Sequence, residues 1–70
     1  MVRLSEIRKE HGLSQKQLAA ALSLEQTHIS RWERGSRKPS ADSLIALCKI
    51  LKTSADYLLG LENDDGSKNY

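Results

Sequence analysis

The sequence has 70 residues, enough for one small domain and too few for a second. Its apolar content of 39% includes many alanines and leucines and no Phe, a composition that favours a helical bundle over a sheet. The net charge is +2, a single cysteine excludes an internal disulfide, and the longest apolar run falls far short of the ~20 residues of a membrane span. We therefore expect one all-α domain in the cytoplasm, with no metal, no cofactor and no membrane contact.

The charge is unevenly distributed along the chain. Residues 1–61 carry ten Lys or Arg and six Asp or Glu, a net charge of +4, whereas residues 62–70 have a net charge of −2 and no apolar periodicity. We expect a folded domain over 1–61 and a disordered or linker tail over 62–70. Residues 31–38 hold four basic residues and one acidic residue, a concentration that suits a phosphate backbone.

A first helix is predicted over about residues 3–11. Leu4 and Ile7 face the core, and Gly12 stands where a helix commonly ends in a left-handed cap. Arg8 follows Ile7, and from the pattern alone it is a solvated basic residue.

A second helix is predicted over residues 15–22. Ser14 is a natural N-cap, because Gln17 stands three residues later and completes a capping box. The helix has one apolar stripe, formed by Leu18, Ala19 and Leu22. Gln15 lies in its first turn, where being a good helix former explains it adequately.

A third helix is predicted over Glu25–Arg34, after a tight corner at Ser23. Ile29 and Trp32 give it an inward apolar side. Two helices joined by so short a turn cross steeply, and the small side chain of Ala19 lets their backbones approach beneath Ile29. The pattern indicates a helix-turn-helix.

The third helix has two faces. At 100° per residue, the side facing the bundle carries Glu25, Ile29, Trp32 and Glu33. The outward side is polar or cationic and lacks a carboxylate; it carries Gln26, Thr27, Ser30, Arg31 and Arg34. Gln pairs with adenine, Arg with guanine, and the Thr methyl contacts thymine. We predict base contacts by Gln26, Thr27 and Arg31, with Ser30 a weaker candidate, against the alternative of an ordinary solvated surface.

A loop rich in polar and helix-breaking residues follows at 35–39. A loop after a helix that enters a DNA groove passes close to the backbone, so Arg34, Arg37 and Lys38 are candidate phosphate contacts. Their alternative role is solubility. His28 is expected to pack beside the second helix or to touch a phosphate rather than to bind metal.

Two further helices are predicted in the last third of the chain. Ser40 caps the first of them, whose core-facing stripe is Leu44, Leu47, Cys48 and Leu51. Cys48 is interpreted as a small buried hydrophobe. The last helix spans about residues 55–59, and either Thr53 or Ser54 is its cap.

The end of the last helix carries more apolar side chains than one short element buries. Leu58 is assigned to the core. Tyr57, Leu59 and Leu61 are predicted to include the contacts of a dimer.

Several motifs occur in one order and at fixed spacing: Gly12-Leu13-Ser14-Gln15, Leu18-Ala19, Ile29-Ser30-Arg31-Trp32-Glu33-Arg34-Gly35, Pro39-Ser40 and Ser54-Ala55-Asp56-Tyr57-Leu58-Leu59-Gly60. On these motifs, about residues 4–60 resemble the Cro/repressor-type helix-turn-helix family of bacterial and phage transcriptional regulators. The resemblance implies a compact five-helix lambda-repressor-like DNA-binding domain. Ser23 departs from the family, which usually has glycine at the turn.

The resemblance also implies roles for four polar residues. Arg8 is expected to form a structural ion pair with Glu33, which joins the first helix to the third. Gln15 is expected to bind a phosphate and to brace Gln26, since two amides together supply the donors and acceptors for that arrangement.

The function implied is sequence-specific regulation of transcription on double-stranded DNA, as a repressor rather than an activator. The helix at 25–34 is expected in the major groove of a palindromic operator bound by a homodimer, with half-sites about 34 Å apart. The alternative is an antitoxin-like module that binds an unidentified protein and autoregulates its own promoter. An enzyme is disfavoured, because no Ser/His/Asp or Cys/His set has useful spacing and no phosphate-binding loop occurs.

Overall fold

The computed structural model describes residues 1–61. Those residues form five helices and no strand: α1 Leu4–Glu10, α2 Gln15–Ala21, α3 Gln26–Arg34, α4 Ala41–Leu51 and α5 Ala55–Leu58. The expectation of an all-α fold with five helices is thereby confirmed. The predicted tail at 62–70 lies outside the described residues.

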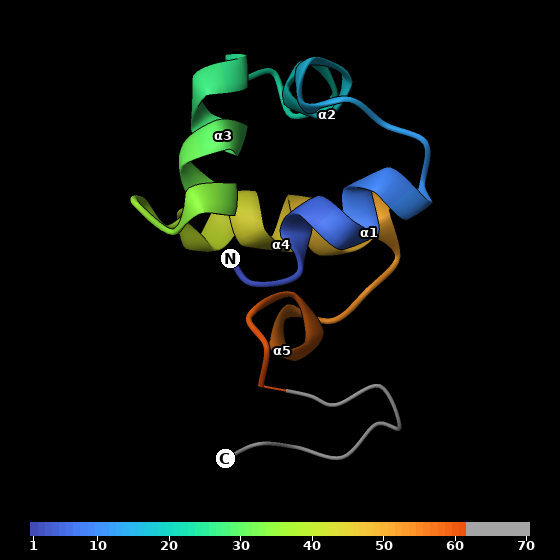
Figure 1. The fold of residues 1–70 in the computed structure, drawn as a ribbon, viewed down its shortest axis with the longest axis vertical. Helices are drawn as coiled ribbons and strands as arrows, with labels where there is room; N and C mark the ends of the chain where they lie inside the picture. Colours follow the sequence, from blue (N-terminus) through green and yellow to red (C-terminus); the bar gives the residue numbers. More distant parts are fainter. Residues whose placement is uncertain (62–70) are drawn as a thin grey trace.

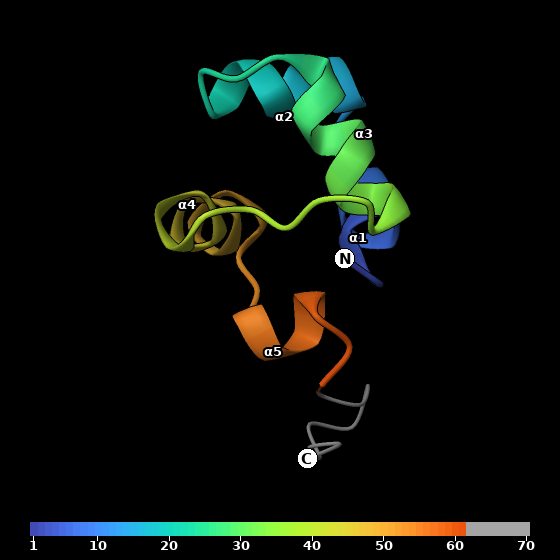
Figure 2. The same ribbon diagram turned by 90° about the vertical axis from the view of Figure 1, so that its left-hand side faces the viewer.

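The helices are arranged around α3, which stands upright while α2 lies across its upper end (Figure 1). α1 and α4 lie near its lower end, and α5 closes the bundle below them. Turning the molecule shows that no other helix passes in front of α3 on this side (Figure 2). The fold therefore holds α3 at the edge of the bundle, with one long side uncovered.

Every helix contributes to a single apolar core. The side chains that are essentially inaccessible to solvent are Leu4, Leu18, Ile29, Leu47, Leu51 and Leu58, which together represent all five helices. α5 is tied to the start of α1 as well, because the backbone N–H of Arg3 donates to the carbonyl oxygen of Leu58 at 3.2 Å. Burying one leucine-sized side chain stabilises a fold by about 1.5–3 kcal/mol, so these six side chains dominate the packing.

Serine side chains begin three of the helices. Ser14 accepts from the Gln17 backbone at 3.0 Å, and the Gln17 side chain accepts from the Ser14 N–H at 2.8 Å, which completes the predicted capping box. Ser40 caps α4 with its hydroxyl oxygen, which accepts from the Ser43 N–H at 3.2 Å. For α5 the structure selects Ser54 over Thr53, since the hydroxyl oxygen of Ser54 accepts from the Tyr57 N–H at 3.1 Å.

The corner between α2 and α3 is made by a serine in a left-handed conformation. Ser23 has φ of 58°, a region that costs an L-residue roughly 1 kcal/mol. The turn is closed by the N–H of Leu24, which donates to the carbonyl oxygen of Ala19 at 2.9 Å. Ser23 thus adopts the backbone conformation that glycine takes without strain.

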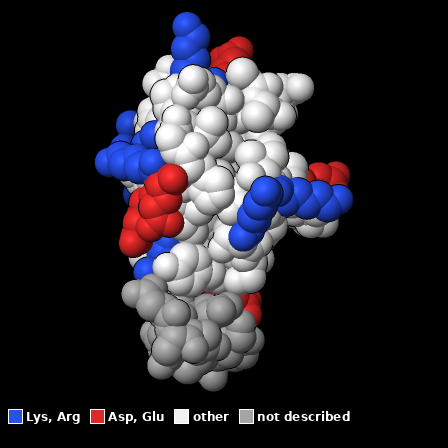
Figure 3. All heavy atoms as spheres, turned by 90° about the vertical axis from the view of Figure 1, so that its right-hand side faces the viewer, with Lys and Arg blue, Asp and Glu red and all other residues white. Residues whose placement is uncertain are grey.

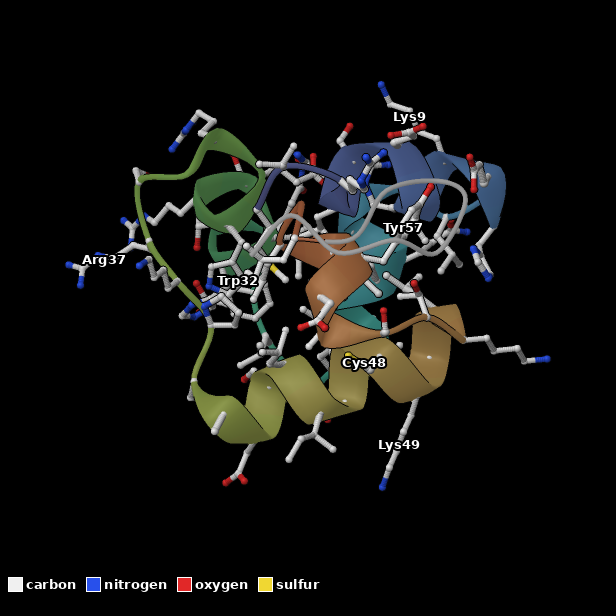
Figure 4. The ribbon with its side chains drawn as sticks, turned by 90° about the horizontal axis from the view of Figure 1, so that it is seen from below. Lys9, Trp32, Arg37, Cys48, Lys49 and Tyr57 are labelled. Atoms are coloured by element: carbon white, nitrogen blue, oxygen red, sulfur yellow. The ribbon has the colours of Figure 1, made fainter. Side chains whose placement is uncertain are left out.

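Two expectations about burial are wrong in detail. Glu25 was placed on the bundle side of the third helix, but α3 begins at Gln26, and Glu25 is an exposed N-cap whose side chain makes no capping hydrogen bond. Cys48 is half-buried rather than fully buried; it points from α4 toward the interior (Figure 4) and packs against the core, and burial raises the pKa of its thiol. Among residues 1–61, no helix has the length and apolar character required to cross a membrane.

Candidate nucleic-acid interface

The two faces of α3 are sharply different. Ile29 is 0% exposed and Trp32 is 5% exposed, so one side of the helix is fixed in the core. On the other side, Gln26, Thr27, Arg31 and Arg34 are all exposed to solvent. Ser30 is half-buried, and therefore presents less of its side chain than the other candidates for base contact do. The helix is held by its apolar side and exposes its polar side to solvent.

A chain of polar contacts runs from the buried end of α1 to the exposed start of α3. We call it the polar relay; its members are Arg8, Glu33, Gln15 and Gln26. Arg8 Nε donates to Glu33 Oε2 at 2.6 Å, and Arg8 Nη2 donates to Glu33 Oε1 at 3.3 Å. Gln15 Nε2 donates to Glu33 Oε1 at 2.9 Å, and Gln26 Nε2 donates to Gln15 Oε1 at 3.2 Å.

The ion pair at the inner end of the relay is well enclosed. The Arg8 and Glu33 side chains are only 10% and 9% exposed, and Arg8 Nη1 also donates to the carbonyl oxygen of Leu13 at 2.8 Å. Burial acts to raise the pKa of Glu33, but the hydrogen bonds from Arg8 and Gln15 and the positive charges of Arg8 and Lys9 outweigh it, so that the pKa lies below its usual value. Glu33 is therefore a carboxylate at neutral pH.

The structure brings Arg8 to Glu33 and Gln15 to Gln26, the two pairs that the resemblance implied. The contact between Gln15 and Glu33 is an addition, because the resemblance paired Gln15 with Gln26 and a phosphate only. Sequence position gave no signal for it: the two residues are 18 apart and lie on different helices.

The loop after α3 turns sharply and carries its cations outward. Gly35 adopts φ of 79°, and the N–H of Ser36 donates back to the carbonyl oxygen of Arg31 at 3.0 Å, which ends the helix. Arg37 and Lys38 are exposed, and Arg37 points away from the helices, whereas Trp32 points toward the middle of the molecule (Figure 4). Both cations are thus free to meet an anion that lies alongside α3.

A hollow of about 390 Å³ separates α3 from the loop and the start of α4. Its lining combines apolar, aromatic and cationic side chains: Leu24, His28, Arg31, Trp32, Arg37, Lys38, Pro39, Ser40 and Ser43. His28 is exposed in this lining, and its ring centroid lies 6.3 Å from that of Trp32 on the same helix. Among the described residues, no three His, Cys, Asp or Glu side chains gather as a metal site would require.

Sequence reasoning did not associate the start of α4 with this surface. Ser40 and Ser43 line the hollow next to Arg31, so the first turn of α4 faces the same space as the cations of the loop. The available signal was the Ser40 cap directly after Lys38 and Pro39, because a helix start next to basic residues favours anions.

Another side of the molecule carries both positive and negative charges, unlike the polar side of α3. Figure 3 views the side where the α1–α2 and α4–α5 connections run, and there basic and acidic side chains lie around a broad uncharged area. By contrast, the segment from Arg31 to Lys38 has one acid, Glu33, and that acid is paired with Arg8. The exposed carboxylate nearest in sequence to the polar side of α3 is Glu25, which we had expected to face the bundle.

The predicted dimer contacts lie at the opposite end from α2. Leu59 is 37% exposed and Leu61 is 38% exposed, while Tyr57 is half-buried with the Arg3 guanidinium 4.6 Å above its ring. Val2, which sequence reasoning missed, is 79% exposed; a Cβ atom built on Gly60 would lie 3.4 Å from its side chain. We call Val2, Tyr57, Leu59 and Leu61 the apolar end.

Comparison with known proteins agrees with this geometry. The helix-turn-helix family model matches residues 4–58. The transcriptional regulator ImmR of Bacillus subtilis is 39% identical over 66 residues, which cover 94% of this chain and 50% of ImmR. The chain spans about half to three-fifths of the length of the first curated relatives that it matches.

Two solved structures share the fold at clear sequence similarity. The c2 repressor of phage P22, solved in complex with a synthetic operator, is 36% identical with a TM-score of 0.76, over 80% of this chain and 85% of that one. A transcriptional regulator from Listeria innocua is 32% identical with a TM-score of 0.76, over 89% of this chain and 58% of that one. The five helices, the exposed polar side of α3 and these similarities lead to one conclusion: the chain belongs to the Cro/repressor-type helix-turn-helix family of transcriptional regulators.

Proposed function

We propose that this chain binds double-stranded DNA in a sequence-specific manner and represses transcription as a twofold dimer on a palindromic operator. The observation that carries the proposal is the position of α3: Ile29 and Trp32 fix one side in the core, and the opposite side is polar, cationic and uncovered. An α-helix with such a side fits the major groove of B-DNA, while the preceding helix crosses the backbone.

Base contacts are assigned to the exposed side of α3. Gln26 and Thr27 stand at its start, which in this motif is the end nearest the base edges. Arg31 lies one turn further along and is exposed, so it reaches either guanine N7 and O6 or the adjacent backbone. Ser30 is half-buried and has a short side chain, so it is the weaker candidate for a base contact.

Phosphate contacts are assigned to residues around that helix. Gln15 has one Nε2 hydrogen remaining after its bond to Glu33, and a phosphate oxygen accepts it well. Arg34 is exposed at the end of α3, and Arg37 and Lys38 are exposed on the following loop, where they line the hollow. These contacts supply affinity and register rather than sequence choice.

The apolar end is assigned to the dimer. α5, which is followed by the exposed Leu59 and Leu61, lies at the far side of the bundle from α2 (Figure 1), so pairing two copies there leaves both α3 helices uncovered. Twofold pairing would present the two helices to half-sites about 34 Å apart. The P22 relative, described as a repressor and solved with an operator, supports the repressor role.

The test is selection of bound sequences from a random duplex pool. The expected result is a palindromic consensus whose half-site centres are 10–11 base pairs apart, or about one helical turn. A pool that shows no enrichment, at salt concentrations low enough for nonspecific binding, contradicts sequence-specific recognition. Enrichment of a single half-site without a twofold repeat would contradict the dimer and leave base readout standing.

A further inference from the structure

The polar relay has a direction that its chemistry determines. An ionised carboxylate offers only acceptor atoms, whereas a glutamine amide offers an oxygen that accepts and a nitrogen that donates. Since Glu33 can only accept, Gln15 must turn its Nε2 toward it, as the 2.9 Å contact records. The Oε1 atom of Gln15 then faces Gln26. Because this oxygen only accepts, Gln26 donates to it from Nε2, at 3.2 Å.

This direction decides which atoms of Gln26 remain for a partner. One Nε2 hydrogen is used by Gln15, so Gln26 keeps one donor hydrogen and its entire carbonyl oxygen. Adenine presents in the major groove an N6 amino donor beside the N7 acceptor, which matches that pair of groups. Were the relay reversed, the Gln26 oxygen would face Gln15, and mainly N–H groups would point outward, suited to the acceptors of guanine or thymine.

We propose that Glu33 fixes the direction of the relay and thereby makes Gln26 select adenine over guanine and thymine at the base it reads. The inference rests on the proposed function, and deepens it by naming a residue that sets specificity without touching DNA. Glu33 is a positioning residue, and Gln15 transmits its effect from the buried ion pair to the surface.

The surroundings keep the direction constant. Arg8 holds Glu33 by two hydrogen bonds in an enclosed site, so the carboxylate neither swings away nor exchanges with solvent easily. Gln15 is half-buried between the ion pair and Gln26, and therefore has little freedom to rotate its amide by 180°. Gln26 itself is exposed, so that without the relay its amide would flip freely in water.

The central variant is Glu33→Gln, which replaces an acceptor-only group by an amide that both donates and accepts. Binding is measured by fluorescence anisotropy on four duplexes that differ only at the base pair read by Gln26. That pair is identified as the one at which Gln26→Ala abolishes discrimination. We expect wild type to prefer adenine, and Glu33→Gln to reduce the preference over guanine and thymine by about fivefold, the value of one hydrogen bond.

Two further variants separate direction from stability. Gln15→Leu cuts the relay at a half-buried site and leaves the Arg8–Glu33 pair in place, so it lowers affinity on all four duplexes and also flattens the preference. Leu47→Val removes core volume in α4, a helix that carries no member of the relay, and serves as a control that is destabilised but keeps the preference. Circular dichroism establishes that each protein is folded at the assay temperature, and Gln15→Leu decides the matter if Glu33→Gln does not fold.

The outcomes are distinct. Folded Glu33→Gln and Gln15→Leu proteins that keep the wild-type preference overturn the inference, as does a wild type that prefers guanine or thymine at this position. A wild type that prefers none of the duplexes, and enriches no sequence from a random pool, refutes the proposed function itself.

Discussion

Arg8 and Glu33 join α1 to α3 through a contact of 2.6 Å between Nε and Oε2, with about one-tenth of each side chain exposed. The pair lies directly behind the surface proposed to contact DNA, and Gln15 connects it to that surface. Its geometry therefore bears on both the stability of the fold and the placement of α3.

Removing one partner of this pair is expected to lower the stability of the fold strongly. Arg8→Met leaves the Glu33 carboxylate enclosed without its cation, and we expect the free energy of unfolding to fall by about 3–5 kcal/mol. Urea denaturation followed by circular dichroism measures the change. The double variant Arg8→Met/Glu33→Leu should recover much of the loss, because it leaves no unpaired charge; equal losses in the single and double variants would show that packing, not charge, is responsible.

The same pair predicts a dependence of stability on pH. Because the pKa of Glu33 is lower in the folded protein than the ordinary value of 4.5, its contribution is present above that value and is lost as the pH falls through the folded pKa. The stability difference between wild type and Glu33→Gln should therefore be constant near neutrality and shrink in acid. Urea midpoints from pH 7 to about pH 3 test this. A difference that grows on acidification would mean that the carboxyl is not stabilised in its charged form.

Arg31 should act on one base position. Arg31→Ala is expected to weaken operator binding by about 1–3 kcal/mol and to relax sequence preference at a single base pair, since the exposed guanidinium is assigned to a base edge. A panel of duplexes, each altered at one position, measures the effect. Equal weakening on every duplex would instead identify Arg31 as a phosphate contact.

Lys38 should act on the backbone alone. Lys38→Ala is expected to lower affinity uniformly across sequences and to reduce the slope of log affinity against log salt by about one unit. Titrations at several salt concentrations provide the slope. Lys49→Ala, on an exposed position of α4 that points away from the bundle (Figure 4), is the matched control and should leave the slope unchanged. If Lys38→Ala keeps the wild-type slope, Lys38 does not contact DNA.

Substitutions at Leu58 and Leu61 should affect different properties: the stability of each copy and the association of two copies. Leu58 is 0% exposed, and Leu58→Ala should destabilise each copy by about 2–5 kcal/mol. Leu61 is 38% exposed, and Leu61→Ala should change only the dependence of the melting temperature on protein concentration. Thermal melts over a hundredfold range of concentration distinguish the two effects. A wild-type melting temperature that is independent of concentration would argue against a dimer off DNA.

The sequence predicted the helices well because their ends are marked by side chains that act locally. Ser14 and Ser40 cap α2 and α4 as expected, and Gly35 ends α3 in a left-handed conformation. The choice between Thr53 and Ser54 stayed open in the sequence because both carry a hydroxyl. Only the backbone path decides which of them reaches the first turn of α5.

The site was less predictable, because its contacts join residues on different helices. Periodicity alone made Arg8 a solvated residue, and only the family resemblance paired it with Glu33; the structure has Arg8 buried. Glu25 was misplaced because a helical wheel assumes a helical backbone, whereas Glu25 precedes α3 as its N-cap, with an extended backbone of φ −85° and ψ 153°. Val2 was not predicted as part of the apolar end, because it precedes the first apolar stripe. Its side chain lies beside Gly60, near the other end of the described chain.

The shared core has a consequence for motion. Since all five helices place at least one inaccessible side chain in one cluster, α3 cannot detach without exposing Ile29 and opening a void beside its neighbours. Amide hydrogens in the middle of α3 should then exchange with solvent only when the whole domain opens. If the chain binds DNA as proposed, this helix would not change shape to fit a wrong sequence, and discrimination between sequences would then arise from lost contacts at the base edges.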